Sequence, residues 1–284
     1  IMSLPYISQQ MTIYGGIVLI IIGYIGNLIN VLVFSTSQNY RRIPCAFYFL
    51  ISAICNIIYI STNFISRVVT QIDGYDFTRV SSAWCKIRTF CILTFTLMTL
   101  SSTCLATIDQ YLASSQNVYV RQLSNMKCAY RIILIIMIIC ILHGIISILF
   151  IDISPLTRTC GSISVGYSIY NIVYLLALIT TVPSSIMLIF GYLTYRNIHL
   201  TRVLVQQHAD RQLIRMIFIQ VALDLISMVP YSVASAYLNL TATVQKDSNR
   251  QMIESFIFSI LTLLTYCYYT VCLFFLINSK LKIV

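Results

Sequence analysis

The chain has 284 residues, of which 58% are hydrophobic and only 9% are charged, and its mean hydropathy is +0.86. Soluble domains carry roughly 25% charged residues, so this composition excludes an ordinary soluble protein and predicts one embedded in a membrane. The formal charge of +10 does not indicate nucleic-acid binding, because the basic residues are scattered singly between apolar runs.

Seven apolar runs are long enough to cross the hydrocarbon core as helices. They cover about 13–34, 45–68, 85–113, 131–152, 170–195, 212–238 and 253–277. Their length and aliphatic density favour helices, and the alternating pattern of a barrel strand is absent. The sequence therefore predicts an all-α membrane protein in which residues 1–284 form a single bundle of seven transmembrane helices.

The loops predict how the bundle is oriented. Lysine and arginine are more frequent in the loops on the C-terminal side, which predicts an inner C-terminus and an outer N-terminus. The first run has no basic leader and no cleavage site of small residues, so we expect it to act as its own insertion signal. The chain starts at Ile1 and stops shortly after the last run, and a fragment of a longer protein is an open alternative. With the N-terminus outside, Asn239 lies on the outer side, in an Asn-Leu-Thr glycosylation signal.

The ten cysteines fall into two groups. Eight lie within spans or at their inner ends and are expected to serve as small apolar residues: Cys45, Cys55, Cys91, Cys104, Cys128, Cys140, Cys267 and Cys272. Only Cys85 and Cys160 lie on the predicted outer side, where the environment is oxidising. We predict a disulfide between them; two free thiols are the alternative.

Three residues within the spans break the apolar pattern. Pro183 and Pro230 each remove one backbone hydrogen bond and are expected to bend the fifth and sixth helices. Asp224 lies in mid-span, where an ionisable group is costly and should face the bundle interior. Two interpretations stay open for it: a polar switch between two packings, or a protonated acid bonded to a neighbouring helix.

Together, the seven spans, the outer N-terminus and the outer cysteine pair resemble the rhodopsin-like (class A) G-protein-coupled receptors. The resemblance covers essentially the whole chain. Gln110 follows Cys85 by 25 residues, the family's spacing to the arginine of its D-R-Y motif, so Asp109-Gln110-Tyr111 aligns with D-R-Y. Further matches are the signature asparagine Asn27, the start of the third helix at 84–86, Pro183, and the Pro230-Tyr231 pair.

The chain departs from the family at several motifs. Glutamine replaces the arginine at Gln110, Asn56 stands where the second helix usually carries an aspartate, and Met228 stands where the sixth helix favours tryptophan. The seventh-helix N-P-x-x-Y motif aligns only with the sequence at 271–275. No carboxylate remains beside Asn56, Thr99 and Val271, which predicts that no sodium, and no other metal or cofactor, is bound.

The resemblance implies a multi-pass receptor of the plasma membrane with an extracellular ligand and a heterotrimeric G protein as partners. It places coupling and switching at Asp109, Gln110, Tyr111, Asp224 and Pro230, and a ligand pocket at Arg88, Ile92, Thr96, Tyr231, Ser235, Leu261 and Thr265. No enzyme motif is present. A receptor-fold decoy that does not couple, and a transporter or channel, are the alternatives.

Residue types at the predicted pocket narrow the ligand. The seventh run has no lysine for a retinal Schiff base, and Ile92 stands where amine receptors carry an aspartate. The mouth offers cations and aromatics suited to a peptide or an acidic ligand: Arg67, Lys86, Arg88, Tyr170, Tyr174, Tyr231 and Tyr237. The alternative is that these arginines reach lipid phosphates and the tyrosines form an interfacial belt.

Overall fold

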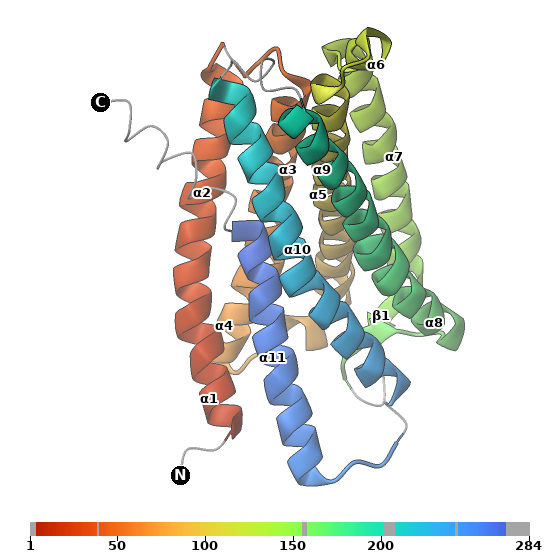
Figure 1. Ribbon diagram of the computed structural model, residues 1–284. Helices are drawn as coiled ribbons and strands as arrows, with labels where there is room; N and C mark the ends of the chain where they lie inside the picture. The colour runs from red at the N-terminus through yellow and green to blue at the C-terminus, as the bar shows by residue number, and fades with distance from the viewer. Residues whose placement is uncertain (1–3, 39, 155–157, 201–207, 242–243, 271–284) are drawn as a thin grey trace.

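The computed structural model of the chain describes residues 4–38, 40–154, 158–200, 208–241 and 244–270. In this part of the chain, seven helices are long and apolar enough to cross a membrane, and they run side by side as one bundle (Figure 1). They are α1–η1–α2 (Leu4–Gln10, Met11–Gly15, Gly16–Thr36), α3–η2–α4 (Pro44–Tyr59, Ile60–Phe64, Ile65–Asp73), α5 (Ser82–Ser114), α7 (Met126–Phe150), α8–η4–α9 (Val165–Val173, Tyr174–Thr181, Val182–Leu200), α10 (His208–Leu240) and α11 (Ser248–Thr270).

Most helices extend beyond the apolar runs, because backbone hydrogen bonding continues past the segment that crosses the hydrocarbon core. The first begins at Leu4 and not at 13. The fourth run is the exception: its last residues leave the helix after Phe150 and enter strand β1 (Ile151–Ile153). The predicted 271–277 part of the seventh span, with Val271, Cys272 and the segment aligned with N-P-x-x-Y, lies outside the described residues.

Side-chain caps and a glycine set several of the ends. The hydroxyl of Ser81 accepts from the Trp84 amide at 3.3 Å at the start of α5, and Asn125 accepts from the Cys128 amide at 2.9 Å at the start of α7; each satisfies a free amide of the first turn. Gly74 ends α4 with a φ of 69°, a left-handed conformation that glycine adopts without strain. Two short helices, η3 (Phe77–Arg79) and α6 (Val118–Gln122), lie in the loops.

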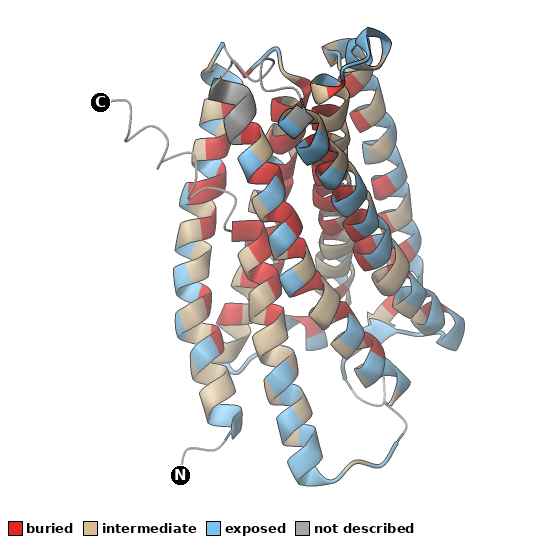
Figure 2. Cartoon of the chain, in the orientation of Figure 1, coloured by how far each residue is buried: buried red, intermediate tan, exposed pale blue. Residues whose placement is uncertain are grey.

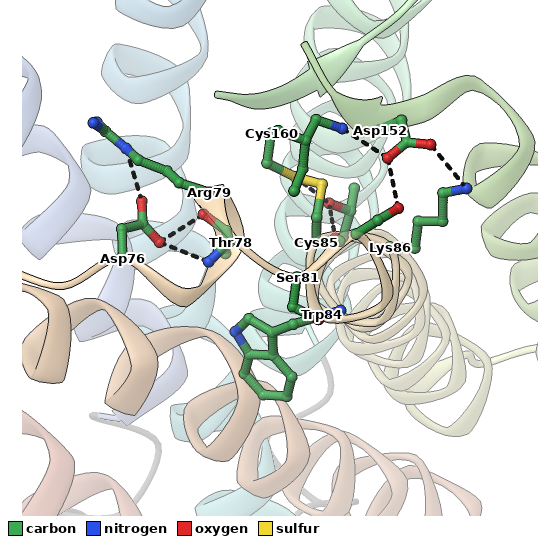
Figure 3. The surroundings of a disulfide bond; sticks show 12 residues. Asp76, Thr78, Arg79, Ser81, Trp84, Cys85, Lys86, Asp152 and Cys160 are labelled. Carbon is green, nitrogen blue, oxygen red and sulfur yellow. Dashed lines mark hydrogen bonds and ion pairs between the residues drawn. A yellow bond between two sulfur atoms is a disulfide. The ribbon is translucent and has the colours of Figure 1, made fainter. Parts of the chain in front are cut away.

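A small hairpin at one end of the bundle carries the disulfide. Strand β1 pairs antiparallel with β2 (Cys160–Ser162), with Ile153 opposite Cys160. Cys160 is joined to Cys85 in the first turns of α5, with the two Cα atoms 5.8 Å apart (Figure 3). The predicted disulfide is confirmed, and it ties the loop after α7 to the start of α5.

Buried residues concentrate between the helices, and the outward faces are mostly exposed (Figure 2). On α7 the exposed residues are large and aliphatic, among them Leu134, Ile138, Leu142, Ile145 and Leu149. In water such a face would be unfavourable, whereas lipid tails solvate it, as composition predicts. The described residues form three hydrophobic clusters: one around Phe49 and Met216, one around Tyr266 and Leu100, and a small one of Cys85, Ile151 and Tyr167.

Candidate functional site

A cavity of about 230 Å³ lies among the helices, close to the disulfide. Its lining comes from α3–η2–α4, α5, η4, α10 and α11. Arg88, one of the lining residues, is about one helical turn along α5 from Cys85. The aromatic part of the lining is Tyr59, Tyr174, Tyr231, Tyr266 and Tyr269, and the apolar part is Ile92, Leu93, Leu175, Ile179 and Met228.

The cavity includes most, but not all, of the ligand residues that the resemblance implied. Arg88, Ile92, Thr96, Tyr231 and Thr265 line it. Ser235 does not: it lies one turn beyond Tyr231, and its carbonyl accepts from the Asn239 side chain at 2.8 Å. Leu261 does not line the cavity either, whereas its neighbour Thr262 does. The seventh-span contribution comes instead from Thr262, Thr265, Tyr266 and Tyr269.

Two arginines face the cavity, Arg67 from α4 and Arg88 from α5. Arg88 Nη2 donates to Asn63 Oδ1 at 3.0 Å. The Nε atom of each arginine is buried without a hydrogen-bond partner, and neither arginine forms a salt bridge within the described parts of the chain. Both interact electrostatically with Tyr231 and Tyr266. The lining contains no carboxylate, so two positive charges share one cavity without compensation.

Stacked rings form one wall of the cavity. Tyr266 stacks on Phe64 with ring centroids 3.7 Å apart, and Tyr59 stacks on Tyr269 with centroids 4.0 Å apart. The Tyr269 hydroxyl donates to Thr96 Oγ1 at 3.2 Å, joining α11 to α5. These contacts hold the aromatic wall in one arrangement, which favours a preformed site over one that assembles around a ligand.

Other cations and tyrosines expected at the mouth do not line the cavity. Lys86 lies 3.2 Å from Asp152 of β1 (Figure 3). Tyr237 donates to Glu254 at 2.9 Å, between α10 and α11. Tyr170 is 41% exposed. Of the seven residues expected at the mouth, four line the cavity and three do not. The four are Arg67, Arg88, Tyr174 and Tyr231; the three are Lys86, Tyr170 and Tyr237.

A buried polar network connects four spans below the cavity. Asn27 Nδ2 donates to the Tyr269 carbonyl at 3.0 Å and to the Gly23 carbonyl at 2.8 Å. Asn56 Nδ2 donates to Asn27 Oδ1 at 3.1 Å, and Thr99 Oγ1 donates to Asn56 Oδ1 at 3.0 Å. Asn56 thus acts as a hydrogen-bonding amide in the place where the family usually has a carboxylate.

Asp224 lies between α9 and α10. Its Oδ2 accepts from Ser184 Oγ at 2.6 Å, its side chain is completely buried, and its Oδ1 has no partner among the residues that the structure describes. Ser184 follows Pro183 directly, and Pro230 stands six residues after Asp224 on α10. The acid therefore faces the bundle interior and links α9 to α10 at their proline positions, a partner that sequence reasoning missed because serines are common throughout the spans.

Among the residues that the structure describes, Asp109 forms no ion pair. Asp109 Oδ1 accepts from Ser124 Oγ at 2.7 Å, and the carboxylate also bonds the Cys45 amide. Gln110 is 3% exposed, and its side chain has no hydrogen bond to any other residue that the structure describes. Tyr111 packs against a phenylalanine of α9 with ring centroids 5.3 Å apart.

Comparison with protein families identifies the chain. The model for the seven-transmembrane receptors of the rhodopsin family matches residues 26–272, which is most of the sequence. The chain therefore belongs to the rhodopsin family of seven-transmembrane receptors, and it is a multi-pass membrane receptor, of a family that is not an enzyme family. Among individual curated proteins, none matches it.

Proposed function

We propose that this receptor binds its ligand in the cavity beside the disulfide and signals to a heterotrimeric G protein at the opposite, Asp109, end. One observation carries the proposal: α10 contributes Tyr231 to the cavity and, about two turns away, Asp224 to the contact with α9. A ligand that moves Tyr231 acts on the same helix as the Asp224–Ser184 bond. Signalling is then a two-state equilibrium that the ligand shifts by differential affinity.

We further infer that residues 1–284 form one domain of a plasma-membrane receptor, with the N-terminus outside and the C-terminus inside. The excess of lysine and arginine in the loops of the Asp109 side supports this orientation. The disulfide supports it independently, because Cys85–Cys160 lies at the other end, which in this orientation is the oxidising side. The ligand is a peptide or small molecule; the cavity offers neither a lysine for retinal nor a carboxylate for an amine.

A receptor that binds ligand without coupling is the second candidate, and Gln110 favours it. The position is buried and uncharged, so the cation that would pair with Asp109 is missing. In this case the fold would serve as a decoy.

Agonist-independent nucleotide exchange on a purified G protein distinguishes the two. We expect Gln110→Arg to raise the exchange rate of the purified receptor in nanodiscs, because it restores the cation next to Asp109. Gln122→Arg is the matched control: it adds the same charge at an exposed position of α6, near the same end, and should leave the rate unchanged. Equal rates for wild type and Gln110→Arg, at equal surface expression, would contradict coupling through this triplet.

A further inference from the structure

We infer that the cavity beside the disulfide recognises a small organic carboxylate, held between Arg67 and Arg88. The inference deepens the proposed ligand-binding function and rests on it for the location of the site. Both arginines line a cavity that has no acidic residue among its described lining residues, and an anion bound between two like charges relieves their repulsion.

Four other cations at this end have acidic partners within the protein. Lys86 pairs with Asp152, Arg79 pairs with Asp76, and Lys246 and Arg250 share Glu254. Asp76, Asp152 and Glu254 are therefore engaged away from the cavity. Arg67 and Arg88 differ from these cations in facing a space that a ligand can fill.

Donor geometry favours an oxyanion. A guanidinium has five N–H donors and no acceptor, and Arg88 uses one of them on Asn63 at 3.0 Å. Asn63 is 7% exposed and lines the same cavity as Tyr59 and Tyr266, so it positions Arg88 beside the tyrosine rings. The Nε atoms of both arginines have no partner among the described residues, so the protein leaves part of each guanidinium unused, and a guanidinium is the group that binds carboxylates bidentately.

The rest of the lining determines the body of the ligand. Tyrosine rings and aliphatic side chains such as Ile92, Leu93 and Ile179 surround the arginines. Such walls stabilise an apolar group and offer little to a hydrated inorganic ion. The volume of about 230 Å³ is below the roughly 300–1,000 Å³ of sites for drug-sized molecules. A small acid, or the terminal carboxylate and last side chain of a peptide, fits this space.

Thermal unfolding of the purified receptor in nanodiscs tests the inference without any G protein. The probes are 3-phenylpropanoate and hexanoate, their neutral amides, a tetrapeptide ending in phenylalanine with a free or amidated C-terminus, and sodium sulfate. We expect each free acid to raise Tm in a saturable way, because a ligand that binds the folded state stabilises it. The amides and sulfate should not. The apparent affinities of the small acids and of the peptide with a free C-terminus are then compared, and whichever binds more tightly identifies the source of the carboxylate.

The variants locate the binding. Arg67→Gln and Arg88→Gln should each weaken the apparent affinity for the acids by about 10- to 100-fold, the value of a hydrogen bond to a charged group. Arg88→Lys should also weaken it, since an ammonium lacks the fork of donors. Arg79→Gln, which removes a cation already paired with Asp76 outside the cavity, is the matched control and should retain wild-type affinity.

Three results would overturn the inference: no acid stabilises the wild type more than its amide, the Arg67→Gln/Arg88→Gln double variant still responds like the wild type, or Arg79→Gln loses as much affinity as the cavity variants. Failure of the coupling proposal is separate. If acids bind as expected and nucleotide exchange on G protein is never stimulated, the coupling proposal is wrong and the carboxylate site stands.

Discussion

Asp224 illustrates how much a single side chain depends on one partner. Its carboxyl group is fully buried and accepts one hydrogen bond, from Ser184 on the neighbouring helix. Of the two interpretations open from the sequence, the contact with a neighbouring helix is present, and it joins α9 and α10 where their prolines have already removed backbone bonds. A bond at this position is well placed to act as a switch between two packings.

We predict that Ser184→Ala destabilises the receptor by about 1–3 kcal/mol, because it leaves a buried acid without its only hydrogen-bond donor. Asp224→Asn should cost less, since its amide oxygen still accepts from Ser184. The measurement is thermal unfolding in nanodiscs. Ser227→Ala is the matched control, because that hydroxyl donates to the Leu223 carbonyl of its own helix. Equal losses for Ser184→Ala and Ser227→Ala would show that the interhelical bond contributes nothing.

Among the elements, the hairpin of β1 and β2 is attached to α5 at two points. The first is the disulfide between Cys85 and Cys160, which spans 75 residues. We predict that a Cys85→Ser/Cys160→Ser double variant loses about 2–5 kcal/mol of stability, since the cross-link no longer restricts the unfolded chain. Thermal unfolding with and without reductant measures this. Reductant should lower Tm of the wild type and leave the double variant unaffected; a reductant-insensitive wild type would mean that no disulfide forms.

The second attachment point is Asp152. The Ser82 hydroxyl, the Ile153 amide and the Lys86 ammonium hold the pKa of the Asp152 carboxyl at about 2, below its ordinary value of 3.8 (Figure 3). Because the pKa is lower in the folded state, the stabilisation is present above about pH 4 and is lost as the pH falls toward 2.

Melting curves of wild type and Asp152→Asn between pH 2 and 5 should therefore converge at the acidic end and separate above about pH 4, with the wild type more stable. Lys86→Met should remove part of the difference at every pH in which Asp152 is charged. Parallel curves across the range would contradict the role given to this carboxylate.

For the whole molecule, the amide network of Asn27 holds four spans in register. Asn27→Ala leaves the Tyr269 carbonyl and the Asn56 amide without their partner, and we predict a loss of about 1–3 kcal/mol for each unpaired group. Asn30 of the same helix is the control: it is 1% exposed and its Oδ1 has no partner, so Asn30→Ala should cost less in the same melting assay. A larger loss for Asn30→Ala would argue against the network.

Some side-chain positions at the site were predictable from the sequence, and others were not. The disulfide was predictable because Cys85 and Cys160 are the only cysteines on one side of the bundle. The inward position of Asp224 was predictable because an acid in mid-span has no other favourable environment. Its partner Ser184 was not predictable, since the sequence of a single span does not indicate which helix packs against it. For the same reason Ser235 and Leu261 were assigned to the pocket and do not line it.

Composition and run length were sufficient to determine a membrane protein with seven helices, because twenty apolar residues in succession have one stable arrangement in lipid. Only the tertiary structure decided that Arg67 and Arg88 share one cavity while Lys86 turns to Asp152. Each of these cations lies near an end of an apolar run, and its surroundings depend on the rotation of its helix about its own axis. That rotation is determined by packing between helices that are distant in the sequence, which is why the charge of the cavity becomes visible only in the folded bundle.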